Sequence, residues 1–405
     1  MRRWLAFPFF VAALGALILP AETPRAMAQD KNDPIEETFL TADGIQLRGL
    51  FTKSLKNGGS DPVVILLYPP GKGNDMGKGD WKGLAKLLST EGYNVLQFDW
   101  RGHGKSTEIK DPARFWNLPP APGNPDPNPF TGPWNSLRMI TGAPNPMGKG
   151  KIKNDLFLKD IKDPVKYAPV FLMDLAAARH HLDTKNDAGD LNTSSIYLIG
   201  SDAAAPLGMA WLVTEWNRPA FLPTANQLAF MGPGAFPTYK YVPQPLAGGL
   251  PNELGGGDIS GAIWLSAAKA NSVPDPLMKS FISKGAPKLR ENNPMLFLFA
   301  PKDTKAKTAS EFFVNEVLVA KPPAGSPLTK LDQTQALDVK QGAGLNGVAL
   351  LGANAGTETL ITQYLAALQK NRAKLIRKNR GFTAPWFIQL HPDNNFGPGF
   401  GFRPN

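Results

Sequence analysis

Apolar and polar positions follow two different periods along this chain. Short runs in which nearly every residue is apolar are typical of strands buried on both faces, and stretches with apolar residues three and four positions apart are typical of helices. From about residue 36 to residue 375 the two patterns alternate. Such an alternation predicts an α/β fold, a mostly parallel sheet with helices on both faces.

Residues 38–51, which contain the Asp43–Gly44 turn, have the pattern of an antiparallel opening hairpin. Further strands are expected at 63–68, 93–98, 195–199, 259–266, 295–300 and 334–339. Helices are expected at 81–90, 171–182, 206–217, 276–289, 305–320 and 357–374.

Two segments interrupt this alternation. Residues 118–146 are too rich in proline and glycine for regular structure, and residues 219–257 are irregular where a lid would insert. We therefore expect one domain over 36–375 with insertions at about 108–165 and 219–257. Residues 376–405 form a C-terminal tail to which the sequence assigns no role.

The first 28 residues have the composition of an export signal. Arg2 and Arg3 precede an apolar run, and Ala26-Met27-Ala28 supplies a small-x-small cleavage site. We expect cleavage after Ala28 and a secreted or periplasmic mature chain without a transmembrane segment. The alternative is a retained N-terminal anchor, because the apolar run is near the lower length limit for a membrane span.

Composition narrows the choice of partners. The 405 residues include no cysteine and carry a formal net charge of +10. Disulfides are therefore excluded, and a basic surface can attract acidic polymers. The lysines are scattered without interleaved aromatic residues, so we expect a small-molecule or acidic-polymer ligand and no nucleic acid. No histidine pair has metal-binding helical spacing, and we expect neither a metal nor a cofactor.

Two motifs lie at strand ends: DWRGHGKS at residues 99–106, and IGSDAAAP at residues 199–206, which joins a strand to a helix. In this order and context they resemble the α/β-hydrolase fold, most closely its branch of serine esterases, lipases and aminopeptidases. The resemblance covers roughly residues 36–375. It implies the fold, and a site built from a nucleophile, an acid and a base.

In working members a serine stands at the centre of the turn, where this chain has Asp202. A structural reason for aspartate exists, because it tolerates a positive φ and is favoured at a helix N-terminus. The functional alternative is a carboxylate nucleophile, as in the haloalkane dehalogenase and epoxide hydrolase branch. Ser201, one residue earlier, is expected to point away from the site.

The resemblance implies Asp303 as the acid and places Asn346 where the family has its histidine base. Asparagine cannot accept and return a proton near neutral pH. His103, His180 and His181 lie elsewhere in the pattern, which leaves His391 in the tail as an alternative base. For the oxyanion hole the resemblance implies Ala203 and either Pro70, which has no N–H, or Gly71.

Nucleophile, base and oxyanion hole thus all depart from the family pattern. We expect an exported protein that has lost serine-hydrolase catalysis and acts as a binding or scaffold module. The alternative is an active hydrolase in which Asp202 attacks an ester, epoxide or carbon–halogen bond, with Asp303 and an unconventional base such as His391.

Overall fold

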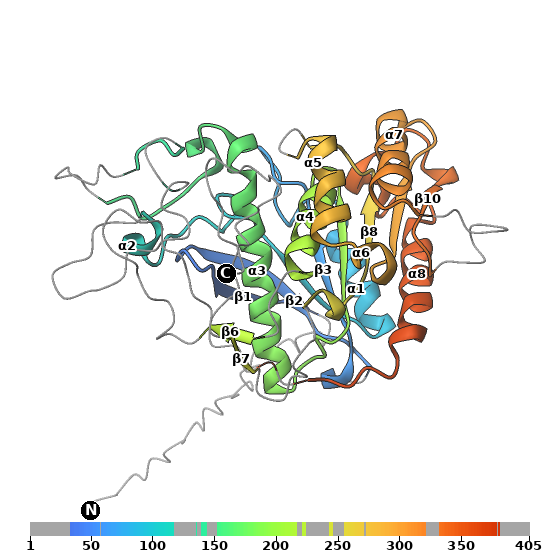
Figure 1. Cartoon of the computed structure of the whole chain (residues 1–405), viewed down its shortest axis with the longest axis horizontal. Coiled ribbons are helices and arrows are strands. Elements are labelled where there is room, and N and C mark those ends of the chain that lie inside the picture. The colour runs from blue at the N-terminus through green and yellow to red at the C-terminus, as the bar shows by residue number, and fades with distance from the viewer. Residues whose placement is uncertain are drawn as a thin grey trace, which may run out of the picture.

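The computed structural model describes residues 33–56, 58–116, 135, 139–143, 152–216, 221–223, 243–245, 255–270, 273–320, 332–378 and 380 (Figure 1). The expected export signal at 1–28, much of both expected insertions and the tail beyond Arg380, His391 included, lie outside these residues.

An eight-stranded sheet forms the centre of the molecule, in the order β1-β2-β4-β3-β5-β8-β9-β10. Its strands are β1 (Ile35–Leu40), β2 (Gln46–Thr52), β3 (Val63–Leu67), β4 (Asn94–Phe98), β5 (Ile196–Ser201), β8 (Ile259–Leu265), β9 (Met295–Phe299) and β10 (Gln335–Asp338). β2 is antiparallel to β1 and β4, and all other pairs are parallel. This confirms the mostly parallel sheet with an opening hairpin. A separate antiparallel pair joins β6 (Phe221–Pro223) to β7 (Pro243–Pro245).

The helices between the strands are α1 (Trp81–Glu91), α2 (Pro112–Phe115), α3 (Pro164–Ala188), α4 (Ala204–Trp216), α5 (Asp275–Ser280), α6 (Leu289–Asn292), α7 (Thr304–Phe312) and α8 (Thr357–Arg372). Two expected helices differ from the prediction. The one at 276–289 ends early in a π-helical turn at Phe281–Gly285, and the one at 305–320 passes into a π-helical turn at Phe313–Val317.

The helix expected from residue 171 begins seven residues earlier, at Pro164. Asp163 caps it by accepting a hydrogen bond from the Lys166 N–H at 3.1 Å, and proline suits the first helical position. Gly189 ends it with a φ of 93°, a conformation that favours glycine. The early start carries α3 up to the carboxyl edge of the sheet.

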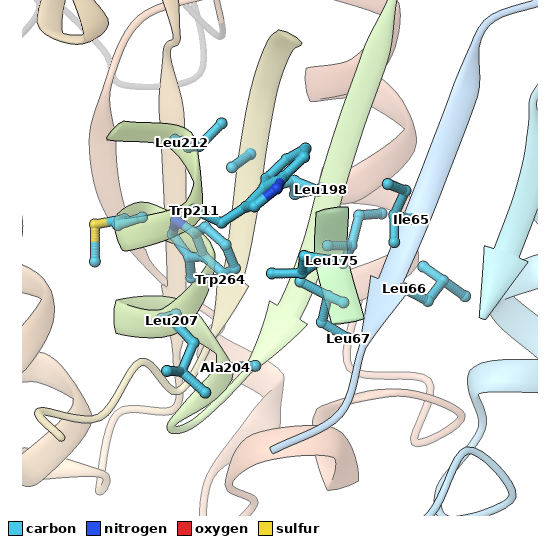
Figure 2. Close-up of a cluster of buried hydrophobic side chains, with 14 of the residues drawn as sticks. Ile65, Leu66, Leu67, Leu175, Leu198, Ala204, Leu207, Trp211, Leu212 and Trp264 are labelled. Atoms are coloured by element: carbon cyan, nitrogen blue, oxygen red, sulfur yellow. The ribbon is translucent and has the colours of Figure 1, made fainter. Parts of the chain in front are cut away.

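Neighbouring residues of β5 show that helices cover both faces of the sheet. Leu198 packs with Leu175 of α3 and Trp211 of α4 (Figure 2). The preceding residue, Tyr197, points to the opposite face, where its hydroxyl donates a hydrogen bond to Gln369 of α8 at 2.7 Å. α3 and α4 therefore cover one face and α8 the other, which confirms the layered α/β prediction.

A buried ion cluster ties the opening hairpin to this core. Arg101, fully buried in the loop after β4, donates to Asp43 in the hairpin turn at 2.7 and 3.1 Å. Its Nε donates to Asp174 of α3 at 2.7 Å, and its backbone N–H donates to the same carboxylate at 2.9 Å. Asn135 donates a further hydrogen bond to Asp43 at 2.9 Å. The cluster therefore joins three parts of the chain.

Within the part of the chain that is described, no helix combines the length and apolarity that crossing a membrane requires.

Replacing Arg101 with methionine should lower the free energy of unfolding by about 3–5 kcal/mol, because it leaves two buried carboxylates without their counter-charge. Urea denaturation measures this loss. Arg48→Met is the control: Arg48 is a partly exposed arginine whose ion pairs with Glu36 and Glu108 span 4.0 and 3.9 Å. It should cost less than about 1 kcal/mol. Equal losses in the two variants would contradict the assigned role of the cluster.

Candidate functional site

The carboxyl ends of the parallel strands meet at one edge of the sheet, and the loops that follow them enclose two cavities there. The first, here called the triad cavity, has a volume of about 620 Å³. It is lined by Asp202, Ser266, Ala267, Ala268, Lys269, Asp303, Thr304, Lys305, Ala306, Thr308, Ala309 and Asn346. The three positions that the resemblance assigned to nucleophile, acid and base thus line one cavity.

Asp202 stands in a sharp turn between β5 and α4, with a φ of 50°. Its N–H donates to the Leu265 carbonyl at 3.0 Å, and its carbonyl accepts from the Ala268 N–H at 3.1 Å. These bonds fasten the turn to the segment after β8. The turn needs small neighbours, because a Cβ on Gly200 would lie 2.9 Å from the Trp264 ring. The geometry is that of a nucleophile elbow with aspartate at its centre.

Burial raises the pKa of the Asp202 carboxyl to about 6; the nearby Ser201 hydroxyl opposes this shift and the negative charge of Asp303 adds to it. The carboxylate packs against Gly347, where a Cβ would approach its Oδ2 to 2.3 Å. At neutral pH the group is therefore mostly ionised and close to Asn346, the neighbour of Gly347 in sequence.

Asp303 follows β9 and caps α7, accepting a hydrogen bond from the Ala306 N–H at 3.0 Å. Asn346 lies in the loop after β10 and is exposed. Both positions match the places that the resemblance assigned. Asp303 has a structural task as a helix cap, and Asn346 offers an amide where the site would need a base.

Three of the four histidines lie within the described residues, and none of them lines the triad cavity. His181 of α3 pairs with Glu37 through an Nε2–Oε2 contact of 2.6 Å, and its neighbour His180 lies on the same helix. His103 has both ring nitrogens engaged. Its Nε2 accepts from the Gly71 N–H at 2.9 Å, so that its Nδ1–H donates to the Arg101 carbonyl at 3.0 Å. Burial lowers the pKa of His103 and favours this neutral form.

The hydrogen bond between the Gly71 N–H and His103 also affects the expected oxyanion hole. Pro70 has no N–H, and the N–H of Gly71 is bound to His103. Ala203, just before α4, is partly exposed, and no hydrogen bond from its N–H is found within the described residues. One of the two donors that an oxyanion hole needs is therefore in use.

Ser201 is fully buried at the end of β5. The sequence analysis did not single out Ser266, which directly follows β8 and lines the triad cavity. Ser266 has a φ of 44° and is 2% exposed, and its hydroxyl has no hydrogen-bond partner in the described structure. Its position after a buried strand was the available signal, but a serine at a strand end is too common to indicate a site.

The second cavity, here called the large cavity, has a volume of about 800 Å³ and adjoins the first through Lys269, which lines both. Lys269 pairs with Asp275 at 2.6 Å and was not anticipated from the sequence. Pro70, Gly71, His103 and Ala203 also line this cavity. Its remaining walls come from the loops after β3 and β4, the segment after β8, the segment before α3 and the first turns of α3 and α4.

Among the described residues, no group of three or more His, Cys, Asp or Glu side chains is placed to hold a metal ion.

No family model and no curated protein matches the sequence. Solved structures similar to the chain include an esterase from Pyrococcus furiosus, with 14% identity, a TM-score of 0.42, and coverage of 82% of this chain and 90% of that one. A Rhizomucor miehei esterase has 12% identity and a TM-score of 0.42, covering 85% and 86%. A protein of unknown function from Agrobacterium tumefaciens, suggested to be an α/β hydrolase, has 15% identity and a TM-score of 0.43, covering 84% and 98%.

The fold can be identified from the chain's own geometry. The sheet is mostly parallel with helices on both faces, and β5 passes through a positive-φ turn into α4. The positions matching nucleophile, acid and base follow in the chain order Asp202, Asp303, Asn346 and line one cavity. This architecture is that of the α/β-hydrolase fold.

Proposed function

We propose that this protein is an exported α/β-hydrolase-fold protein that has lost catalysis and binds a ligand in the cleft at the carboxyl edge of its sheet. One observation carries the proposal. The three triad positions converge on one cavity, and no histidine is among the described residues that line it.

Neither hydrolase pathway can run a full cycle with these groups. A serine pathway lacks its nucleophile, because Asp202 replaces the serine and Ser201 is fully buried. In an aspartate pathway, a carboxylate oxygen of Asp202 attacks carbon and displaces a halide or opens an epoxide C–O bond, which leaves an alkyl ester; attack on an ester carbonyl expels the alcohol and leaves a mixed anhydride. A base must then activate water to hydrolyse either intermediate. Asn346 cannot take the proton from that water. Loss of a base costs on the order of 10⁶ in turnover in enzymes of this kind.

A second candidate function is an active hydrolase with Asp202 as nucleophile. The observation in its favour is that the carboxylate of Asp202, held at a φ of 50°, lines a cavity large enough for a small substrate. This candidate needs a base from outside the described residues, for which His391 is the one histidine left.

The activity test uses short p-nitrophenyl esters, epoxides and haloalkanes with the mature protein and with Asp202→Ala. We expect no turnover above that of the variant, because no histidine among the described residues lines the triad cavity. Turnover that is lost in Asp202→Ala would establish the second candidate function. Its further loss in a His391→Gln variant would identify the base.

Asp202 is also expected to make stability depend on pH. Its pKa in the folded protein, about 6, lies above the usual 3.8, so the folded state binds more protons and loses stability as pH rises from about 4 to about 6. Asp202→Asn keeps a residue that tolerates positive φ and removes this loss. Because the side chain is partly exposed, the variant should be more stable by about 1–2 kcal/mol at pH about 7.5 and equal at pH about 3.5.

Urea denaturation at both pH values measures the difference. Asp338→Asn, which removes an exposed carboxylate at the end of β10, is the control and should change stability by less than about 0.5 kcal/mol. A less stable Asp202→Asn protein at the higher pH would show that the ionised carboxylate has a stabilising partner, which contradicts the site described here.

Export is tested by expressing the full chain in a Gram-negative host. We expect the protein in the periplasm, with an intact mass that corresponds to a chain beginning at Gln29, because the small-x-small site directly precedes this residue. Full-length protein in the membrane fraction would instead support the retained anchor.

A further inference from the structure

We propose that the large cavity binds an amphipathic organic anion, a small molecule with an apolar body and a carboxylate or phosphate head. This inference rests on the proposed binding function and names the ligand class for that cleft. It is carried by three features of the cavity: its apolar wall, its unbalanced positive charge and its size.

One wall of the cavity is apolar. Its residues come from the segment before α3 and from the first turns of α3 and α4: Leu158, Ile161, Val165, Ala168, Phe171 and Leu207. Ile161, Phe171 and Leu207 belong to the buried core, with exposed fractions of 4%, 3% and 2%. Their cavity-facing atoms provide a surface from which an alkyl or aryl group displaces water.

The lining of the cavity also carries positive charge. Lys72, Lys159 and Lys269 line it, and Asp75 is the single carboxylate among the described lining residues. Lys269 is paired with Asp275. Lys72 and Lys159 have no carboxylate partner within the described residues, and Lys159 lies over the Phe157 ring at 5.2 Å from its centroid. Two ammonium groups are therefore free to pair with an anion.

Backbone groups add to this preference. α4, which has 13 residues, begins beside Ala203 at the cavity, and the N–H groups of a first helical turn have no partners within the helix. The N-terminal end of a helix also favours negative charge. The Ala203 N–H can therefore donate a hydrogen bond to the anionic head, whereas the Gly71 N–H remains bound to His103.

The volume of about 800 Å³ suits a small molecule, since ligand pockets range over about 300–1,000 Å³. An acidic polymer would need a charged groove along the surface. The combination of an apolar wall and free lysines in one cavity instead favours a compact ligand with a single charged end.

The test is titration calorimetry of the mature protein with four probes that share an eight-carbon chain: octanoate, octyl phosphate, 1-octanol and octyltrimethylammonium. We expect at least one anion to bind more tightly than 1-octanol, with affinity falling at high NaCl because salt screens the lysines. Comparison of octanoate with octyl phosphate identifies the head group. The cation should bind least.

Variants locate the site. Lys72→Gln combined with Lys159→Gln should raise the Kd of the preferred anion about fivefold to tenfold, because two exposed charge pairs are lost. Val165 is 45% exposed and lines the cavity. Val165→Asp should also weaken binding of the anion, because it places a negative charge on the apolar wall. Lys82→Gln, an exposed lysine of α1 outside both cavities, is the control and should leave the Kd unchanged.

The outcomes separate the inference from the function on which it rests. Equal binding of 1-octanol and the anions, unaffected by the lysine variants, would overturn the anion preference while leaving a binding protein. Absence of binding by all four probes would overturn the inference. Asp202-dependent hydrolysis of p-nitrophenyl octanoate in the same preparation would overturn the proposed function itself.

Discussion

The architecture of the cleft depends on one buried ion cluster, Arg101 with Asp43 and Asp174. It holds the opening hairpin and α3 to the loop after β4, and all three side chains are fully buried. The constraint reaches the cleft through the backbone, because the carbonyl of Arg101 accepts the Nδ1–H of His103. His103 in turn accepts the Gly71 N–H, which fixes the glycine-rich loop after β3. The hydrogen bond from the Gly71 N–H to His103, which holds the two loops together, thus occupies a backbone donor that acyl-transfer chemistry would need for its oxyanion hole.

In the proposed account, the site keeps the arrangement expected of a hydrolase and differs in its chemistry. The elbow, the loop after β9 and the loop after β10 bring Asp202, Asp303 and Asn346 to one cavity. Each residue there has a structural explanation. Asp202 tolerates the positive φ of the turn, Asp303 caps α7, and Asn346 precedes Gly347, which has a φ of 52° and packs against the Asp202 carboxylate. The neighbouring large cavity has an apolar wall and lysines in its lining, the features on which the proposed binding function rests.

Much of this could be predicted from the sequence. Periodicity located the sheet strands and the helices of the main domain, and chain order placed Asp202, Asp303 and Asn346 at the edge where the carboxyl ends of parallel strands meet. The bond between His103 and Gly71, residues from two different loops, could not be predicted, because nothing in a linear pattern says which loop a side chain will meet. Ser266 and Lys269 were missed for the same reason: packing of their segment against the Asp202 turn places them. The π-helical turns at Phe281–Gly285 and Phe313–Val317 were also not predicted, because the periodic pattern does not distinguish a π-helical turn from the end of an α-helix.

The most direct measurement of the central claim, that this elbow no longer performs chemistry, is the intact mass of the mature protein after prolonged incubation with reactive epoxides and haloalkanes. A carboxylate that attacks without a base to complete the cycle would accumulate as an ester and add the mass of the substrate fragment. The account predicts an unchanged mass, with Asp202 acting as a buried structural carboxylate. A stoichiometric adduct that peptide mapping places on Asp202 would contradict it and show that the residue is a nucleophile.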